Sequence, residues 1–209
     1  MAQSNVFSLN VVGYVNTKLV GGGAYNMVAN PLNNSNNNIT NIFQNVPDGS
    51  SIFRWDPTVS DFQSTTYTYA AGAHVWDNGS GNFSGFILNP GEGIFFINNG
   101  GSDITNTFVG DVIQGSYTNS LVGGGSYNGI GSSAPLGGSF TNSIAGLAAA
   151  DGDTVDRWDV VAQDLDGNTP TYDAVHAVWS SDAIVAPGEG FFYIRNGGNV
   201  QWIRNFTVQ

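Results

Sequence analysis

The stretch LVGGGAYN at residues 19–26 returns as LVGGGSYN at residues 121–128, and this duplication decides how the chain is organised. Further segments return in the same order. They are Asp-Gly at 48 and 151, Arg-Trp-Asp at 54 and 157, Tyr at 69 and 172, Trp at 76 and 179, and Pro-Gly-Glu-Gly at 90 and 187. Because self-similarity at a nearly fixed period marks a repeated structural unit, the sequence predicts two tandem modules, at residues 1–109 and 110–209.

Short apolar or alternating runs separated by Gly, Asn, Asp and Pro extend through both repeats. Such runs are typical of β-strands and turns, and we predict strands at residues 7–15, 25–28, 51–55, 65–69, 93–97 and 104–109. Helical sequence is confined to residues 39–44 and 139–149, with Asn38 and Ser139 as N-caps. We therefore expect an all-β protein made of two pseudo-symmetric sandwich or barrel-like modules, each with one short helix.

The composition points to a location outside the cell and excludes several kinds of partner. Only 10% of the residues are charged, and Asn, Ser, Thr and Gly supply the polar surface. The net charge of −11 repels nucleic acids and anionic lipid headgroups, and no apolar run reaches the roughly 18 residues of a membrane span. Cysteine is absent, so disulfides and thiolate sites are excluded. Ala2-Gln3 after Met1 reads as the mature end left by signal-peptide cleavage, which predicts a secreted or cell-surface protein.

The motifs also resemble those of a known group of proteins. VVGYVN at residues 11–16, the duplicated LVGGG and Arg-Trp-Asp motifs, and PGEGFF at residues 187–192 resemble uncharacterised secreted two-repeat β-proteins of environmental bacteria such as verrucomicrobia and planctomycetes. The resemblance covers the chain from Ser8 to Val208. It implies export and a β-rich module, and it brings no known activity or catalytic residue to this chain.

One segment occurs three times in a chain of two repeats. NVFSLNVVG at residues 5–13 aligns with NTFVGDVIQG at residues 106–115, and NFTV at residues 205–208 aligns with the beginning of the same element. The two terminal copies are flanked by a module on one side only, so their strands pair either within the chain or between chains. Pairing between chains would propagate as a fibre. The assembly strand would then present Phe7, Leu9, Val11, Val12 and Tyr14.

Two acidic and two basic residues recur at equivalent positions. Glu92 and Glu189 are the only glutamates, and Arg54 and Arg157 are the only basic residues kept in both repeats. We predict that each repeat pairs its Arg with its Glu, or that the carboxylate accepts backbone N–H groups of the Pro-Gly-Glu-Gly turn. The alternative is a glycosidase-like acid and base. Symmetric copies would have like environments, whereas acid and base need different ones, so we expect no enzyme.

A calcium site is the one metal site that the sequence suggests. Asp164, Asp166 and Asn168 resemble the first half of a calcium loop, in which alternate side-chain oxygens converge on one cation. Val175 stands where such a loop carries its final Glu. An Asp-Gly turn in a surface hairpin explains the same residues without a metal ion.

Four tryptophans recur as equivalent pairs, Trp55 with Trp158 and Trp76 with Trp179. They could stack on sugar rings if exposed, with Trp76 or Trp179 lining the groove, or they could pack in the cores. The sequence favours a non-enzymatic extracellular structural protein that self-assembles into a filament, sheath or surface layer. The alternative is a carbohydrate-binding module that uses exposed Trp and Tyr side chains.

Overall fold

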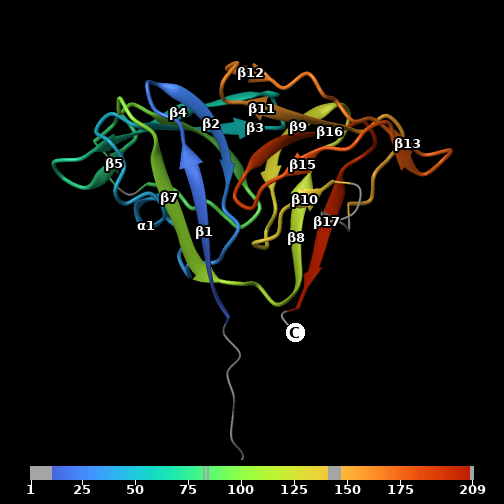
Figure 1. Cartoon of the computed structure of the whole chain (residues 1–209), viewed down its shortest axis with the longest axis horizontal. Helices are drawn as coiled ribbons and strands as arrows, with labels where there is room; N and C mark the ends of the chain where they lie inside the picture. Colours follow the sequence, from blue (N-terminus) through green and yellow to red (C-terminus); the bar gives the residue numbers. More distant parts are fainter. Residues whose placement is uncertain (1–10, 82, 84, 141–146, 208–209) are drawn as a thin grey trace, which may run out of the picture.

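The computed structural model describes residues 11–81, 83, 85–140 and 147–207. The first half of the chain contains β1 (Val12–Leu19), β2 (Ala24–Ala29), α1 (Ile39–Ile42), β3 (Ser51–Asp56), β4 (Asp61–Ala70), β5 (Val75–Asp77), β6 (Gly93–Asn98) and β7 (Ile104–Asp111). The second half contains β8 (Gly115–Leu121), β9 (Ser126–Gly131), β10 (Gly138–Ser139), β11 (Thr154–Asp159), β12 (Asp164–Leu165), β13 (Tyr172–Asp173), β14 (Val178–Trp179), β15 (Ile184–Val185), β16 (Gly190–Arg195) and β17 (Val200–Phe206) (Figure 1). The all-β prediction is confirmed. No helix among these residues is long and apolar enough to cross a membrane.

The two halves pair their strands in the same way. The first half has a sheet of order β2-β6-β3-β4-β5 and a two-stranded ribbon, β1-β7. The second half has a sheet of order β9-β16-β11-β12 and the ribbon β8-β17, and both ribbons extend from the same side of the molecule (Figure 1). Tyr69 lies opposite Trp76 as Tyr172 lies opposite Trp179. The duplicated sequence therefore has duplicated strand pairings.

The LVGGG stretch makes the sharp connection from each ribbon to its sheet. Asn26 closes the first connection, because its side-chain oxygen accepts the backbone N–H of Val20 at 2.7 Å and its amide donates back to the Val20 carbonyl at 3.1 Å. Asn128 makes the same two bonds to Val122, at 2.8 and 3.0 Å. Gly22 has a φ of 75°, a left-handed conformation that glycine adopts without a steric penalty. The repeated motif is thus a turn with its own closing residue.

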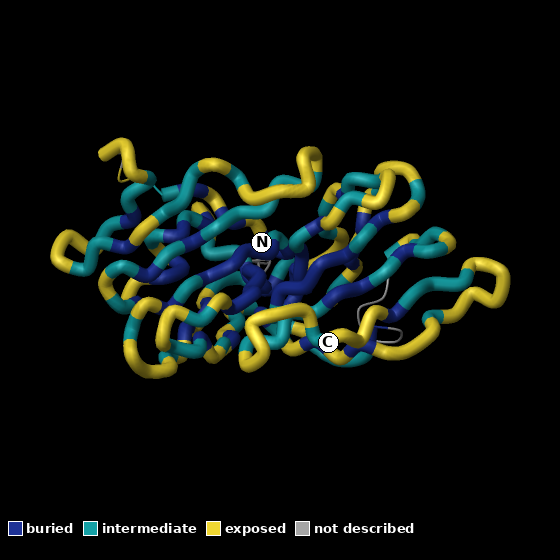
Figure 2. The backbone as a smooth tube through the Cα atoms, turned by 90° about the horizontal axis from the view of Figure 1, so that it is seen from above, coloured by how far each residue is buried: buried dark blue, intermediate teal, exposed yellow. Residues whose placement is uncertain are grey.

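Each half has an apolar core between its ribbon and its sheet. Leu19 of the ribbon and Phe96 of the sheet are fully buried in the first core, and Trp202 and Tyr193 are fully buried in the second. Successive strand residues point to opposite faces, so Phe95 faces away from the first core. It joins a third cluster that contains residues of both halves, namely Met27, Phe95 and Phe192. Buried backbone accordingly runs through the middle of the molecule (Figure 2).

The halves are joined by an exchange of their Pro-Gly-Glu-Gly turns. The backbone N–H of Ala29 in β2 donates to Gly188 at 2.9 Å, and that of Gly131 in β9 donates to Gly91 at 3.1 Å. A Cβ at Gly93 would lie 2.8 Å from a backbone nitrogen of β9, which explains the second glycine of the motif. Each turn therefore covers the end of the other half's edge strand, where an open edge would be a template for pairing with another chain.

The predicted helix at residues 139–149 is wrong where the structure describes it. Ser139, the expected N-cap, lies in β10 opposite Ile184, and residues 147–149 are not helical. Residues 141–146, which make up most of the expected helix, lie outside the described residues. By contrast, α1 does begin after Asn38, whose side chain accepts the N–H of Thr40 at 2.9 Å.

The strands at the ends of the chain differ in extent from the predicted ones. β1 begins at Val12 and runs beyond residue 15, and residues 1–10 lie outside the described residues. β7 continues to Asp111, across the expected boundary at residue 109. In the first ribbon Asn106 lies opposite Thr17, and at the equivalent place in the second ribbon Trp202 lies opposite Asn119. Asn106 is therefore equivalent to Trp202 in the structure. The sequence alignment, which matched residues 106–109 with residues 205–208, is displaced.

Candidate binding site between the two halves

An open hollow of about 610 Å³ lies where the outer faces of the two main sheets meet. None of its lining side chains is charged, and most are aromatic. The lining consists of Tyr25, Trp55, Ser60, Phe62 and Phe95 from the first half and Tyr127, Trp158, Gln163, Leu165 and Phe192 from the second. Tyr25 is equivalent in sequence to Tyr127, and Trp55 to Trp158. We call this site the aromatic hollow, and residues of both halves line it.

The floor and walls of the aromatic hollow are rings in edge-to-face contact. Phe95 and Phe192 are buried and form the floor, with ring centroids 5.9 Å apart. Trp158 of the second half stands against Phe95 of the first, at 5.0 Å and 87°. Trp55 stands against Phe192 in the same way, at 5.2 Å and 69°. Such tilted contacts are the favoured arrangement of aromatic pairs, so the hollow is held open by packed side chains.

Reciprocal hydrogen bonds fix the two indoles. Trp55 donates its Nε1–H to the carbonyl of Tyr127 at 2.7 Å, and Trp158 donates to the carbonyl of Tyr25 at 2.8 Å. The side chain of Gln163 accepts the backbone N–H of Tyr25 at 2.8 Å, so a side-chain amide occupies the edge of β2. Both indole N–H groups and the Gln163 side-chain amide are therefore already bonded within the protein.

The rim of the aromatic hollow is open to solvent. The exposed fractions of Tyr25, Phe62, Tyr127 and Leu165 are 39%, 38%, 36% and 38%. Single exposed apolar residues are ordinary on protein surfaces, but four around one concavity form a patch of the kind that binds a partner or ligand. The geometry suits the insertion of apolar side chains or the stacking of a flat apolar face.

Two polar grooves flank the aromatic hollow, and each shares one tryptophan with it. A groove of about 290 Å³ contains Trp55 together with Arg54, Glu92 and Asn119. Its counterpart, of about 320 Å³, contains Trp158 together with Arg157, Glu189, Lys18 and Asn26. Guanidinium, carboxylate and amide groups thus lie on one side of each indole, and the apolar hollow lies on the other.

Each Pro-Gly-Glu-Gly turn carries an Arg–Glu ion pair. Arg54 donates its Nε–H to Glu92 at 2.9 Å, and Arg157 donates to Glu189 at 3.0 Å. The second oxygen of each glutamate accepts a backbone N–H at the start of its own turn, at 3.2 and 2.7 Å. Arg157 also lies 3.5 Å from Asp166. Each Glu thus makes both contacts that the sequence offered as alternatives, and these contacts shape the turns that join the halves.

The tryptophans expected to line a glycan groove are elsewhere. Trp76 is fully buried in the first core, and its Nε1–H donates to the carbonyl of Phe43 at 3.3 Å. Trp179 is half-buried and packs against Phe140, with ring centroids 5.1 Å apart. Burial excludes Trp76 from stacking on a ligand, so of the two alternatives this residue takes the core position. Trp55 and Trp158 are half-buried as well, and they are the tryptophans that line the aromatic hollow.

The suggested calcium ligands are engaged in local hydrogen bonds. Asp164 accepts the N–H of the next residue at 2.8 Å, and Asp166 accepts the N–H of Asn168 at 2.9 Å. The side-chain oxygen of Asn168 accepts the hydroxyl of Ser181 at 2.9 Å. Among the described residues, no group of three or more His, Asp or Glu side chains is placed to hold a metal ion. These contacts are those of a surface turn.

The described part of the expected assembly strand pairs within the chain. Val12 lies opposite Asp111 and Tyr14 lies opposite Val109 in the β1-β7 ribbon. The carbonyl of Val11 accepts a further backbone N–H from the chain just after β7, at 2.7 Å. Phe7 and Leu9 lie outside the described residues. One edge of this strand is therefore occupied from residue 11 onward.

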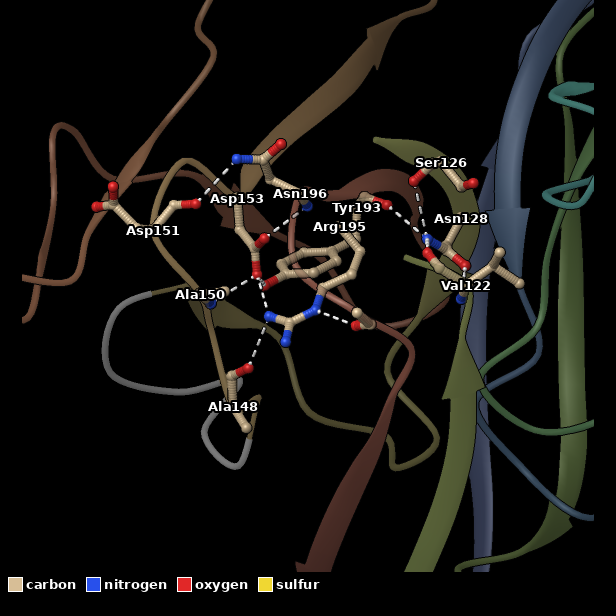
Figure 3. Close-up of polar contacts among 11 residues, drawn as sticks. Val122, Ser126, Asn128, Ala148, Ala150, Asp151, Asp153, Tyr193, Arg195 and Asn196 are labelled. Atoms are coloured by element: carbon tan, nitrogen blue, oxygen red, sulfur yellow. Dashed lines mark hydrogen bonds and ion pairs between the residues drawn. The ribbon is translucent and has the colours of Figure 1, made fainter. Parts of the chain in front are cut away.

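The second half contains a buried ionic cluster around Asp153 (Figure 3). The carboxylate of Asp153 accepts hydrogen bonds from Tyr193 at 2.5 Å, Arg195 at 2.6 Å, and the backbone N–H groups of Ala150 and Asn196 at 2.8 and 2.7 Å. Burial alone would raise the pKa of Asp153, but these donors outweigh it and lower the pKa. The equivalent positions in the first half carry a serine, a phenylalanine and an asparagine. The cluster fastens the chain before β11 to the turn after β16.

Most of the aromatic hollow was not predicted from the sequence, although the repeated motifs contain a signal for it. Tyr25 and Tyr127 belong to the repeated LVGGG motif, and Phe95 and Phe192 follow the repeated Pro-Gly-Glu-Gly turn. Comparison with protein-family models, with curated proteins and with solved structures returned no match for this chain. The geometry of the aromatic hollow is therefore the basis on which a function is proposed.

Proposed function

We propose that this chain is a non-enzymatic, exported structural protein that assembles head to tail from copies of itself into a filament, sheath or surface layer. The open aromatic hollow carries the proposal. It exposes four large apolar side chains around one concavity and has no charged lining residue. A patch of this kind favours association, because burying it removes apolar surface from water.

The backbone contacts of the edge strands β2 and β9 support assembly through the hollow rather than through those two edges. The backbone of Ala29 in β2 and of Gly131 in β9 is bonded to the turns of the opposite half. Gln163 occupies the edge of β2 at Tyr25. These backbone groups are already hydrogen-bonded within the chain, so they are not available to pair with a strand of a second copy. The apolar hollow is open to a second copy.

The ion pairs support a non-enzymatic role. Glu92 and Glu189 each bind one arginine and one backbone N–H in equivalent turns. A glycosidase needs one carboxyl group held protonated and the other ionised, which requires unlike surroundings. The repeated glutamates thus have a structural role that accounts for their recurrence.

Removal of residues 1–10 tests self-assembly. We expect the whole chain to form large oligomers in light scattering and fibres or sheets in negative-stain electron microscopy, and the shortened chain to be monomeric with an unchanged far-UV circular dichroism spectrum. A matched control replaces Ser4 and Asn5 by glycine and keeps the apolar residues that follow. A whole chain that is a monodisperse monomer at high concentration would refute self-assembly.

A second candidate function is carbohydrate binding, favoured by the two polar grooves. Trp55 and Trp158 each present an indole beside guanidinium, carboxylate and amide groups, a combination that can stack on a sugar ring and bond its hydroxyl groups. Affinity electrophoresis in gels that contain soluble polysaccharides tests it. Retardation that is lost in Trp55→Ala and kept in Val175→Glu would support this candidate, and equal mobility in every polysaccharide would refute it.

A further inference from the structure

We propose that the aromatic hollow of one copy binds the apolar segment at residues 6–9 of another copy. The inference rests on the self-assembly proposed above and names both partners of the contact. The donor is the sequence Val6-Phe7-Ser8-Leu9, and the acceptor is the concavity walled by Trp55 and Trp158.

The chemistry of the two partners is complementary. Residues 1–10 contain no acidic or basic side chain, although the whole chain carries a net charge of −11. The acceptor likewise has no charged lining residue. The donor can therefore approach without desolvating a charge and with little repulsion from the acidic surface. In an extended segment, Phe7 and Leu9 point to the same side, so both enter the hollow together.

The contact must join two copies, because the segment cannot reach the hollow of its own chain. The hollow lies near the end of β1 that is remote from Val11, since Tyr25 adjoins Asn26 and Asn26 is bonded to Val20 at 2.7 Å. The strand between these ends, Val12–Leu19, is about 23 Å long at 3.3 Å per residue (Figure 1). Phe7 is four residues from Val11 and can be at most about 14 Å from it.

The stoichiometry of this contact makes it propagate. Each chain has one donor segment, which precedes β1 in the sequence, and the described residues form one aromatic hollow, near the end of β1 that is remote from Val11. A contact between unlike surfaces of identical subunits is heterologous, and it continues into an open polymer unless the rotation closes a ring. The equivalent residues that line the hollow do not make two binding sites, because the first donor to enter occupies the hollow and excludes a second.

Complementary full-length variants test the contact. The donor variant carries Phe7→Ser and Leu9→Ser, and the acceptor variant carries Leu165→Glu, which places a charge on the rim of the hollow. We expect each variant alone to be monomeric in light scattering at ten times the concentration at which the parent assembles. An equimolar mixture should form a heterodimer of twice the monomer mass and nothing larger. Val175→Glu is the matched control, because this valine is 85% exposed on a hairpin away from the hollow, and it should assemble like the parent.

A peptide gives a second measurement on the same contact. Residues 2–10 as a synthetic peptide contain no tryptophan, so titration into the donor variant should change the emission of Trp55 and Trp158 and saturate at one peptide per chain. The peptide with Phe7→Ser should bind at least tenfold more weakly.

The outcomes separate the two proposals. If the parent does not assemble, self-assembly and this inference both fail. If the donor variant is monomeric but Leu165→Glu still assembles, self-assembly stands and the aromatic hollow is refuted as the acceptor. A third result is that the donor variant forms a closed dimer and Leu165→Glu does not. That result would mean that two hollows face each other, and it would also overturn the inference. Displacement of the peptide by a polysaccharide, with no assembly of the parent, would assign the hollow to a glycan instead.

Discussion

Replacing Asp153 by serine, the residue at the equivalent position of the first half, should lower the free energy of unfolding by about 3–5 kcal/mol at pH 7. Asp153 is fully buried and accepts four hydrogen bonds, two of them from Tyr193 and Arg195. The side chain of Arg195 is only 10% exposed, so the Asp153→Ser protein keeps a nearly buried guanidinium without its carboxylate. An unpaired charge in such a place costs more than the ion pair itself contributes.

The chain supplies its own control for this prediction. The first half carries Ser50, Phe96 and Asn98 where the second carries Asp153, Tyr193 and Arg195. The triple variant Asp153→Ser, Tyr193→Phe and Arg195→Asn removes the whole ionic cluster, and it should recover to within about 1 kcal/mol of the parent, since a buried ion pair is often replaceable as a set. Urea unfolding followed by tryptophan fluorescence and by circular dichroism gives the free energies. A single variant that loses less than about 1 kcal/mol, or a triple variant no more stable than the single, would refute the reasoning.

Three other predictions concern stability. The pKa of Asp153 is lowered in the folded protein, so its contribution is present above the unfolded value of about 3.9 and is lost as the pH falls through the lower folded value. The triple variant lacks this contribution, so the stability of the parent relative to the triple variant, measured by urea midpoints, should fall as the pH is lowered below about 4, and a constant difference would contradict this. Gly93→Ala should lower the free energy of unfolding by about 1–3 kcal/mol, because a Cβ would lie 2.8 Å from a backbone nitrogen of the other half. Gly198→Ala, where a Cβ would meet no atom, should change the free energy of unfolding by less than about 0.5 kcal/mol, and thermal unfolding measures both. Trp158→Phe should lower the free energy of unfolding in urea by about 1 kcal/mol, because the hydrogen bond to the Tyr25 carbonyl is lost while Gln163 still donates to that carbonyl at 3.3 Å. A loss above about 3 kcal/mol would mean that the indole contributes more than this hydrogen bond.

The Pro-Gly-Glu-Gly turns link the fold to the proposed assembly. Because each turn binds the edge strand of the opposite half, the outer faces of the two sheets are held side by side. Trp55 and Trp158 then reach across the junction to bond Tyr127 and Tyr25. Damage at Gly93 should therefore open the aromatic hollow as well as destabilise the protein, and loss of assembly should accompany loss of stability in that variant.

Local chemistry was enough to predict the all-β class. Alternating apolar residues specify strands wherever one face is buried, and the Gly-rich turns carry their own closing residues, Asn26 and Asn128, within a few positions. Ser139, the expected N-cap of a helix at residues 139–149, lies in a strand for a non-local reason. β10 pairs with β15, about 45 residues along the chain.

The aromatic hollow depends on tertiary structure, because exposure is decided by which sheet face meets the other half. Trp55 and Trp76 look alike as repeated aromatics in strand sequence, yet Trp76 points into the first core and Trp55 points across the junction. The register of the strands sets which face each side chain takes, and the contact between the turns sets what that face meets. Repetition, strand pattern and turn chemistry are thus properties of short segments, whereas the site arises only where residues about 70 to 130 positions apart are packed together.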